Sequence, residues 1–101
     1  MAVTKSSAVE REILRPLWKV HILHHASKAP VLGNWMLEEL REHGYRVSPG
    51  TLYPLLGRMV GLGWLNRDRE GRHRICPAGR RVLAEVRRRL RELQREVFAG
   101  A

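Results

Sequence analysis

The sequence predicts a mainly α-helical chain with one small two-stranded antiparallel sheet and a long last helix. Three observations support this fold class. Apolar residues recur at three- and four-residue spacing in the stretches before residue 63, as on the buried faces of helices. Between residues 64 and 75 the pattern changes to that of two short strands. From residue 77 to residue 97 the helical period returns without interruption. A chain of 101 residues with these elements fits one domain.

Composition favours a polyanionic partner. Lys and Arg number 19 against 10 Asp and Glu, which gives a formal net charge of +9. Such a balance favours nucleic acid ahead of a membrane surface. The single cysteine, Cys76, excludes an internal disulfide and fits a reducing cytoplasm. Because no long apolar run opens the chain, we expect neither a signal peptide nor a membrane span, and hence a cytoplasmic protein.

The first helical region should contain a break. Residues 1–7 are small and polar, and we expect them to be loosely ordered. Residues 9–15 form a short amphipathic stretch, which Pro16 should break or kink at Arg15 because proline disfavours a helical conformation in the residue before it. Residues 16–26 then form a nearly apolar helix that contains three histidines.

A second helix is expected over about residues 32–43, after a loop at residues 27–30. Gly44 follows where a helix end favours a positive φ. Residues 45–47 should then form a short extended linker into the helix around which the rest of the chain is organised.

That central helix begins near residue 48 and ends at Gly61 or Gly63. Its buried face is marked by apolar residues at helical spacing, namely Leu52, Leu55, Leu56 and Met59. Its first residues carry almost no side chain, so the backbone N–H groups and the positive end of the helix dipole can approach a phosphate. Two starts are possible, with Ser48 or Thr51 as the N-cap. We favour Thr51, because Pro54 then falls at the third helical position, where its missing N–H is not needed.

Residues 64–69 and 72–75 are predicted to form a hairpin, or wing, with its turn through Glu70 and Gly71. Four guanidinium groups lie on it, from Arg67, Arg69, Arg72 and Arg74. Exposed arginines can lie along a phosphate backbone or enter a narrow minor groove. The alternative is a solvated hairpin held by cross-strand charge pairs.

The last helix carries a narrow apolar seam. Leu83, Val86, Leu90, Leu93 and Val97 are spaced 3, 4, 3 and 4 residues apart, as in a coiled coil. A helix of about 21 residues spans about 30 Å, so part of it should project from the domain and need a partner. Because the first helix, around Trp18, can supply part of the other side, we predict a two-fold dimer.

These elements together predict a winged helix-turn-helix. Residues 1–76 would be the DNA-binding domain and residues 77–101 the dimerisation helix, within one compact unit. Residues 47–59, VSPGTLYPLLGRM, followed by Gly63–Leu65, closely resemble the PadR family of bacterial transcriptional regulators, and the likeness extends from about residue 16 to residue 93. The resemblance implies a homodimer on a palindromic operator, usually a repressor that a small-molecule effector releases. It also implies that residues 48, 50, 51 and 53 contact DNA. The candidate DNA-binding residues are Ser48, Pro49, Gly50, Thr51, Tyr53, Arg58, Arg69, Arg72, His73 and Arg74.

The chain departs from the family pattern in two places. The second helix begins with Leu32–Asn34 where members usually have His-Gly-Tyr, and the wing has Arg72 and His73 where paired aromatic residues are common. These changes make the wing more basic and leave the effector open. Some short members bind flat aromatic drugs through a tryptophan in the last helix. Because this segment offers only Phe98, we do not expect that site here.

His21 and His25 lie four residues apart, with His24 between them, so one helix face could offer two ligands to a metal ion. Cys76 could add a thiolate if the fold brought it near. No carboxylate lies beside these residues in the sequence, so we expect no metal and no cofactor. A metal- or small-molecule-sensing winged-helix regulator is the alternative.

Other classes of function receive little support. No phosphate-cradling glycine loop or oriented nucleophile is present, so we expect no enzyme. A pure protein-interaction module would have no reason to combine a wing with a bare helix start. A non-specific architectural or RNA-binding protein remains an alternative that a specificity ratio would separate from an operator-binding one.

Overall fold

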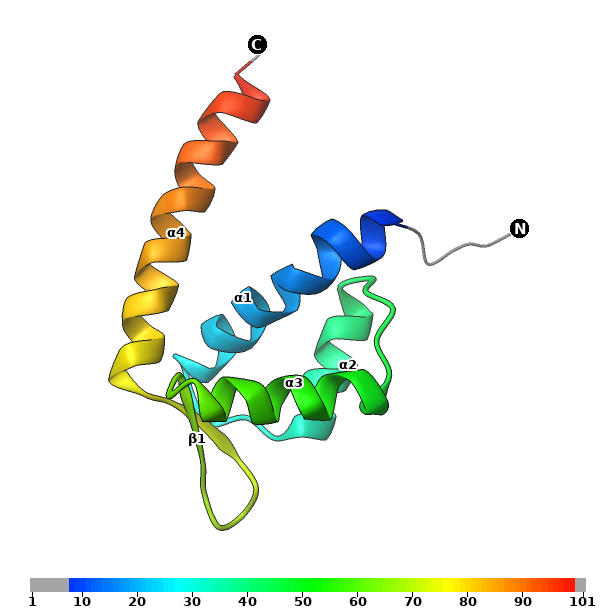
Figure 1. Ribbon diagram of the computed structural model, residues 1–101, viewed down its shortest axis with the longest axis vertical. Helices are drawn as coiled ribbons and strands as arrows, with labels where there is room; N and C mark the ends of the chain where they lie inside the picture. The colour runs from blue at the N-terminus through cyan, green and yellow to red at the C-terminus, as the bar shows by residue number, and fades with distance from the viewer. Residues whose placement is uncertain (1–7, 100–101) are drawn as a thin grey trace, which may run out of the picture.

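Three helices and a hairpin form the body of the protein, and a fourth helix rises from it (Figure 1). The elements run α1 (Arg15–Ala26), α2 (Gly33–Glu42), α3 (Pro49–Gly61), β1 (Leu65–Arg67), β2 (His73–Ile75) and α4 (Pro77–Phe98). The computed structural model describes residues 8–99, and the loosely ordered segment expected at residues 1–7 lies outside them. Across the described residues, no helix combines the length and apolarity that crossing a membrane requires. The predicted fold class, mainly α with a two-stranded antiparallel sheet, is confirmed.

Of the break or kink predicted at Arg15, the break is wrong, because the helix continues, although its hydrogen-bond pattern changes at this residue. A π-helical segment, η1 (Glu10–Leu14), runs directly into α1. The backbone N–H of Arg15 donates to the carbonyl of Glu10, five residues back, instead of four. A proline within an α-helix lacks its N–H, and its ring collides with the carbonyl four residues back. The wider π turn accommodates Pro16 without ending the helix.

The core lies between the three helices of the body and the base of the hairpin. Its fully buried side chains come from all of these elements, namely Trp18, Ile22, Leu23, Met36, Leu40, Leu52, Leu56, Met59 and Leu65. The expectation that Trp18 contributes to a dimer interface is therefore wrong, because its side chain has no exposed surface and belongs to the core of its own chain.

Helix α3 begins earlier than predicted. Ser48 is the N-cap, and its carbonyl accepts the N–H groups of Thr51 (3.1 Å) and Leu52 (3.0 Å). Pro54 consequently lies inside the helix, so the carbonyl of Gly50 loses its usual N–H partner. Both residues are exposed, and water can satisfy that carbonyl. The start at Thr51 was predicted because a proline inside a helix leaves a carbonyl without its N–H partner. That cost is large in a buried helix and small here, where water reaches the carbonyl of Gly50.

The hairpin is short and is attached to the body by a third backbone segment. Leu65 pairs with Ile75 and Arg67 with His73, and Gly71 takes a φ of 82° in the turn. Val31, in the loop before α2, exchanges two backbone hydrogen bonds with His73, at 3.0 and 2.7 Å. The wing is therefore anchored beside the start of α2.

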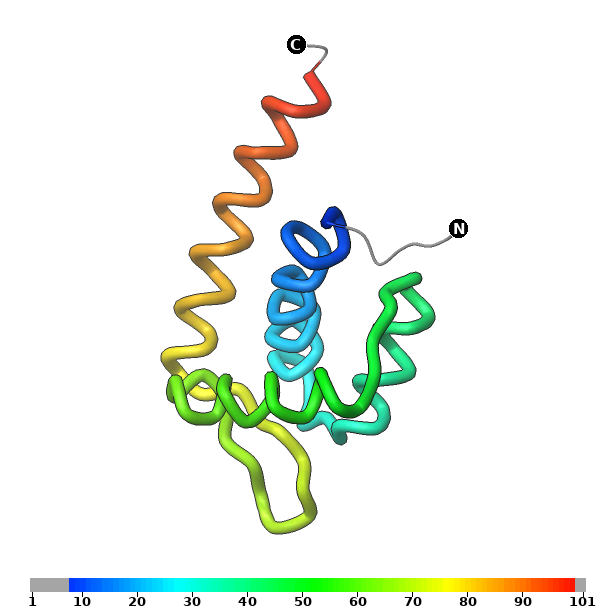
Figure 2. The backbone as a smooth tube through the Cα atoms, turned by 45° about the vertical axis from the view of Figure 1, so that its right-hand side comes forward, coloured from blue at the N-terminus to red at the C-terminus, as the bar shows by residue number. Residues whose placement is uncertain are grey.

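Helix α4 starts tightly packed and ends unsupported. At its base, Gly79 lies against the backbone carbonyl of Trp64, which accepts the N–H of Cys76 at 2.9 Å. Leu83 is buried at 3% exposure against α1 and the core. Farther along, Leu90, Leu93 and Val97 are 39%, 54% and 58% exposed. Figure 2 shows this second half extending past the body, along the molecule's longest dimension of 47 Å.

Candidate nucleic-acid interface

The exposed side of α3 is a stripe of small residues. Seven residues along it face solvent, namely Pro49, Gly50, Tyr53, Pro54, Gly57, Arg58 and Gly61. Their spacing keeps them on one face, opposite the buried residues that fix the helix to the core. Three are glycines, so Tyr53 and Arg58 are the two long side chains that project from an otherwise low ridge. A helix of this shape can bring its backbone close to a flat or grooved partner.

The N-terminal end of α3 is open and carries no acidic residue of its own. No acidic residue occupies its first turn, and no side chain caps its backbone. The hydroxyls of Ser48 and Thr51 lie 3.1 Å apart and bond to each other at the surface. The positive end of the helix dipole is therefore accessible, with the hydroxyls of Ser48 and Thr51 and the small residues Pro49 and Gly50 around it. This arrangement suits an anion such as phosphate.

The wing uses part of its charge to hold its own turn. Arg72 donates from Nε to Asp68 at 2.9 Å and from Nη2 to Glu70 at 3.1 Å, and Arg74 lies 3.5 Å from the same Asp68 carboxylate. Burial acts to raise the pKa of Asp68, but hydrogen bonds from the backbone and side chain of Arg72 outweigh it and hold that pKa below its usual range. Cross-strand charge pairing, the alternative for this hairpin, is thus present at Arg72.

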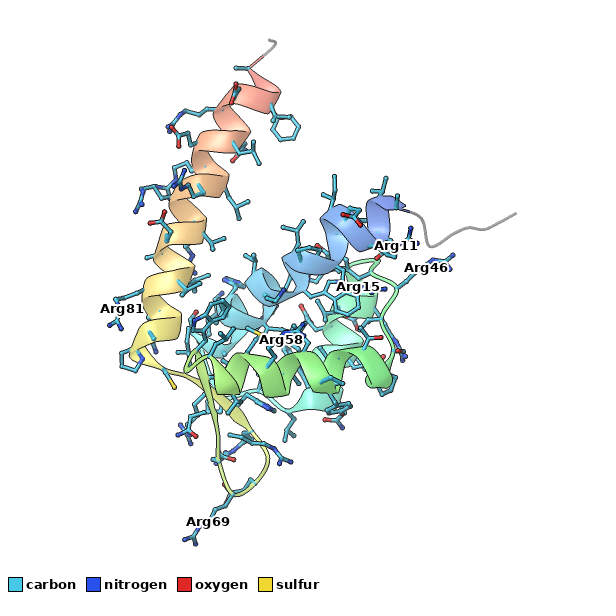
Figure 3. The ribbon with its side chains drawn as sticks, viewed as in Figure 1. Arg11, Arg15, Arg46, Arg58, Arg69 and Arg81 are labelled. Atoms are coloured by element: carbon cyan, nitrogen blue, oxygen red, sulfur yellow. The ribbon has the colours of Figure 1, made fainter. Side chains whose placement is uncertain are left out.

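Arg69 is placed differently. Figure 3 shows it at the tip of the hairpin, pointing away from the body. The carboxylates of Asp68 and Glu70, its neighbours in sequence, accept hydrogen bonds from Arg72. The guanidinium of Arg69 instead points into solvent. It is the wing arginine best placed to reach a partner beyond α3.

His73 does not belong to the exposed surface, contrary to the prediction. Its backbone pairs with Arg67 and Val31 on either side, and strand alternation turns its side chain inward, where it is 5% exposed. Burial lowers the pKa of His73, and the nearby Arg67 acts in the same direction. We therefore remove His73 from the candidate contacts. The other nine lie on α3, its cap or the wing.

A basic flank beside α3 was missed by the sequence analysis. Arg11, Arg15 and Lys19 line a shallow hollow together with Arg58 and Thr51. In Figure 3, Arg11 and Arg15 lie near Arg46, above the N-terminal half of α3. The four-residue spacing from 11 to 15 to 19 is the signal that could have revealed one basic helix face. This face was not recognised, because the break expected at Arg15 placed Arg11 and Lys19 in separate elements.

The histidines gather more closely than predicted. His21 and His25 share one face of α1, and His43, at the C-terminal end of α2, lies beside them. No carboxylate lies beside these histidines in the sequence, but the fold brings one to them: Glu39 Oε2 is 3.3 Å from His25 Nε2 and 3.1 Å from His43 Nε2. Cys76 is not part of this group of described residues. Burial, followed by the charges of His43 and His25, lowers the pKa of His21.

Comparisons with known proteins agree with this geometry. Residues 22–85 match the family model described as transcriptional regulator PadR-like family. The chain is 50% identical over 97 residues to transcriptional regulator Rv3488 of Mycobacterium tuberculosis, covering 89% of this chain and 91% of that protein. Its fold is similar to the X-ray structure of a PadR-like transcription factor from Bacteroides fragilis, with a TM-score of 0.74 and 23% identity over 94% of this chain and all of that one.

The matched region contains the hairpin, α3 and the base of α4, which are the elements described above. The expected resemblance is confirmed, and so is the expectation that the chain is a regulator and not an enzyme. The chain belongs to the PadR-like family of transcriptional regulators.

Proposed function

We propose that this regulator is a cytoplasmic homodimeric repressor that binds a palindromic operator in double-stranded DNA. In this proposal α3 enters the major groove, and Ser48, Gly50, Thr51 and Tyr53 lie closest to the DNA. The observation that carries the proposal is the exposed face of α3, which is rich in glycine and therefore has few long side chains. At its N-terminal end no side chain caps the backbone N–H groups, so the positive end of the helix dipole is accessible. The major groove, about 12 Å wide, accepts a helix whose side chains leave room for close approach.

Basic groups on both sides of α3 support the placement. The flank made by Arg11, Arg15 and Lys19 borders its N-terminal half, and Arg69 reaches out from the wing beyond its other end. A duplex lying against α3 would present one phosphate strand to each. Arginine–phosphate contacts of this kind supply affinity and salt dependence, while side chains in the groove read base edges.

The unsupported apolar surface favours a second copy of the chain. Leu17 and Val20 of α1 and Leu83 and Leu90 of α4 line an open, mostly apolar hollow between the two helices. The same α1 stripe continues to Val9 and Ile13, 56% and 60% exposed, as the α4 seam continues to Leu93 and Val97. Adjacent exposed apolar stripes on two helices are what the corresponding stripes of an identical chain would cover. The seam residue Val86, also on α4, is half-buried.

A two-fold symmetric dimer would favour a palindromic operator and, when bound, would repress transcription. A dimer with a two-fold axis presents two α3 helices in opposite directions, so its best site is a palindrome with half-sites about one helical turn apart. Bound there, a compact dimer covers the duplex and blocks access to it, which represses transcription.

The direct test is a fluorescence-anisotropy titration at near-physiological salt. Duplex from the region upstream of the protein's own gene is compared with a scrambled duplex of equal length. A preference of about a thousandfold or more is expected of a specific regulator. Equal, steeply salt-dependent binding to both would contradict operator recognition and favour a non-specific architectural protein.

A further inference from the structure

Four potential metal ligands from two helices, α1 and α2, lie close together. His21 and His25 come from α1, and Glu39 and His43 from the last turn and cap of α2. The ligand nitrogens of the three histidines all lie within 4.8 Å of one another. The rings of His21 and His43 are 5.0 Å apart between centroids. No part of this cluster is needed for the proposed contacts with DNA.

The spacing is close to that of a metal centre. Two ligands bound at 2.0–2.1 Å to a tetrahedral ion are about 3.3 Å apart. Glu39 Oε2 already lies 3.3 Å from His25 Nε2 and 3.1 Å from His43 Nε2. The ligand nitrogen of His21 lies within 4.8 Å of those of His25 and His43. The i, i+4 pair on α1 fixes the direction of two of the ligands.

The surroundings suit a bound cation as well. Side chains of His25 and Glu39 are 19% and 21% exposed, whereas His43 is 47% exposed and leaves an entry path from solvent. The hydroxyl of Tyr45 lies 2.8 Å from His21 Nε2. When that nitrogen donates its proton to Tyr45, Nδ1 keeps its lone pair for a metal, which is the usual role of an outer hydrogen-bond partner.

We propose that His21, His25, His43 and Glu39 form a binding site for one divalent cation of the Zn²⁺ class. Three imidazoles and one carboxylate favour borderline transition metals over Mg²⁺ or Ca²⁺, which take oxygen ligands. The bound ion would join α1 to the end of α2, just before the linker that leads into α3. This proposal concerns cation binding alone and does not rest on DNA recognition.

The test uses the full chain without a histidine tag, titrated with Zn²⁺ and, for a spectroscopic signal, with Co²⁺. We expect one Zn²⁺ per chain, the intense visible absorption of tetrahedral Co²⁺, and a rise in Tm as Zn²⁺ is added, because a ligand that binds only the folded state stabilises it. Mg²⁺ at the same concentration should give none of these.

Variants locate the site. His43→Ala and Glu39→Gln should each weaken Zn²⁺ binding at least tenfold and reduce the rise in Tm at a given Zn²⁺ concentration, while His24→Ala should behave as the unchanged chain does. His24 is the matched control, because it is adjacent on the same helix and outside the cluster. His43 is half-exposed, so its removal should leave the metal-free Tm nearly unchanged, and this separates lost binding from lost folding. Absence of Zn²⁺ binding by the unchanged chain, or equal binding by His43→Ala, would overturn the proposal.

Discussion

The aromatic ring of Tyr53 lies directly against Gly33. A β-carbon added to Gly33 would stand 3.1 Å from Cζ and 3.2 Å from the hydroxyl oxygen of Tyr53, and closer still to Cε1. Glycine at the start of α2 thus permits the position that Tyr53 takes on the exposed stripe of α3. Because Tyr53 is 46% exposed, its ring has room to swing aside if a larger residue replaces Gly33.

We therefore predict that Gly33→Ala moves Tyr53 and weakens operator binding with little change in Tm. The expected loss is about fivefold, the worth of one contact of about 1 kcal/mol. The measurement is anisotropy on Gly33→Ala, Tyr53→Ala and the double variant. The double variant should bind no more weakly than Tyr53→Ala, since both changes remove the same contact. If the losses of binding free energy in the two single variants add in the double variant, Gly33 acts on binding independently of Tyr53.

A second glycine should be far less tolerant. At Gly79, an added β-carbon would collide with the backbone carbonyl of Trp64, which is held by the N–H of Cys76, and would stand 2.9 Å from Ile75. Gly79→Ala should lower the free energy of unfolding by about 1–3 kcal/mol, as overpacking does. Gly57→Ala, which meets no atom within 4 Å in a helix interior, should be neutral or stabilising by about 0.5–1 kcal/mol. Denaturant unfolding of both compares them, and equal stability would contradict the packing at Gly79.

The wing should contribute affinity without sequence preference. Arg69→Ala should weaken binding to every duplex by a similar factor and reduce the slope of log affinity against log salt by about one, because one phosphate contact is lost. Arg81→Ala is the matched control: Arg81 lies on α4 and points away from the body in Figure 3. Titrations at four salt concentrations measure both. A loss confined to the cognate duplex would mean that Arg69 reads bases instead of touching backbone.

The apolar seam can be tested through the mass of the assembly. Leu90→Asp should convert the proposed dimer to a monomer, because it places a charge where the second copy would bury apolar surface. Leu62→Asp is the control, since Leu62 is 52% exposed at the end of α3, outside the seam. Sedimentation equilibrium gives the masses. A Leu90→Asp chain that remains a dimer would place the interface elsewhere.

The buried His73 predicts a loss of stability in acid. Its pKa is lowered by burial in the folded state, against about 6.5 when unfolded, so the unfolded chain binds a proton first as the pH falls. Stability attributable to this residue is complete above about pH 6.5 and decreases as the pH falls toward the lowered pKa. His73→Gln should reduce the difference in unfolding free energy between pH 7 and pH 5. An unchanged difference would mean that His73 does not titrate during unfolding.

The local pattern of the sequence was sufficient to predict the faces of the helices. Leu52 and Met59 repeat at helical spacing, and alternation around Arg74 marks a strand, so α3 and the wing could be placed from neighbours alone. The start of α3 was wrong because the cost of Pro54 depends on whether the Gly50 carbonyl meets solvent, which is decided by tertiary packing.

Contacts between elements could not be read from periodicity. An apolar residue such as Trp18 fits the core of its own chain and an interface with a second chain equally well, so the sequence does not distinguish the two. In the structure its side chain is fully buried in the core. His43 and Glu39 are distant in sequence from His25, and the packing of α2 beside α1 brings them together. The basic face of Arg11 and Arg15 exists only because a π turn keeps the helix continuous through Pro16.

Selection of binding sites from a pool of random duplexes tests the central claim most directly, since it requires no knowledge of the operator. We expect the enriched duplexes to share a palindrome whose half-site centres lie about 10 base pairs apart. We expect a Leu90→Asp chain to enrich no such palindrome. Enrichment of duplexes without a common sequence, or of a motif without two-fold symmetry, would contradict recognition by a pair of α3 helices.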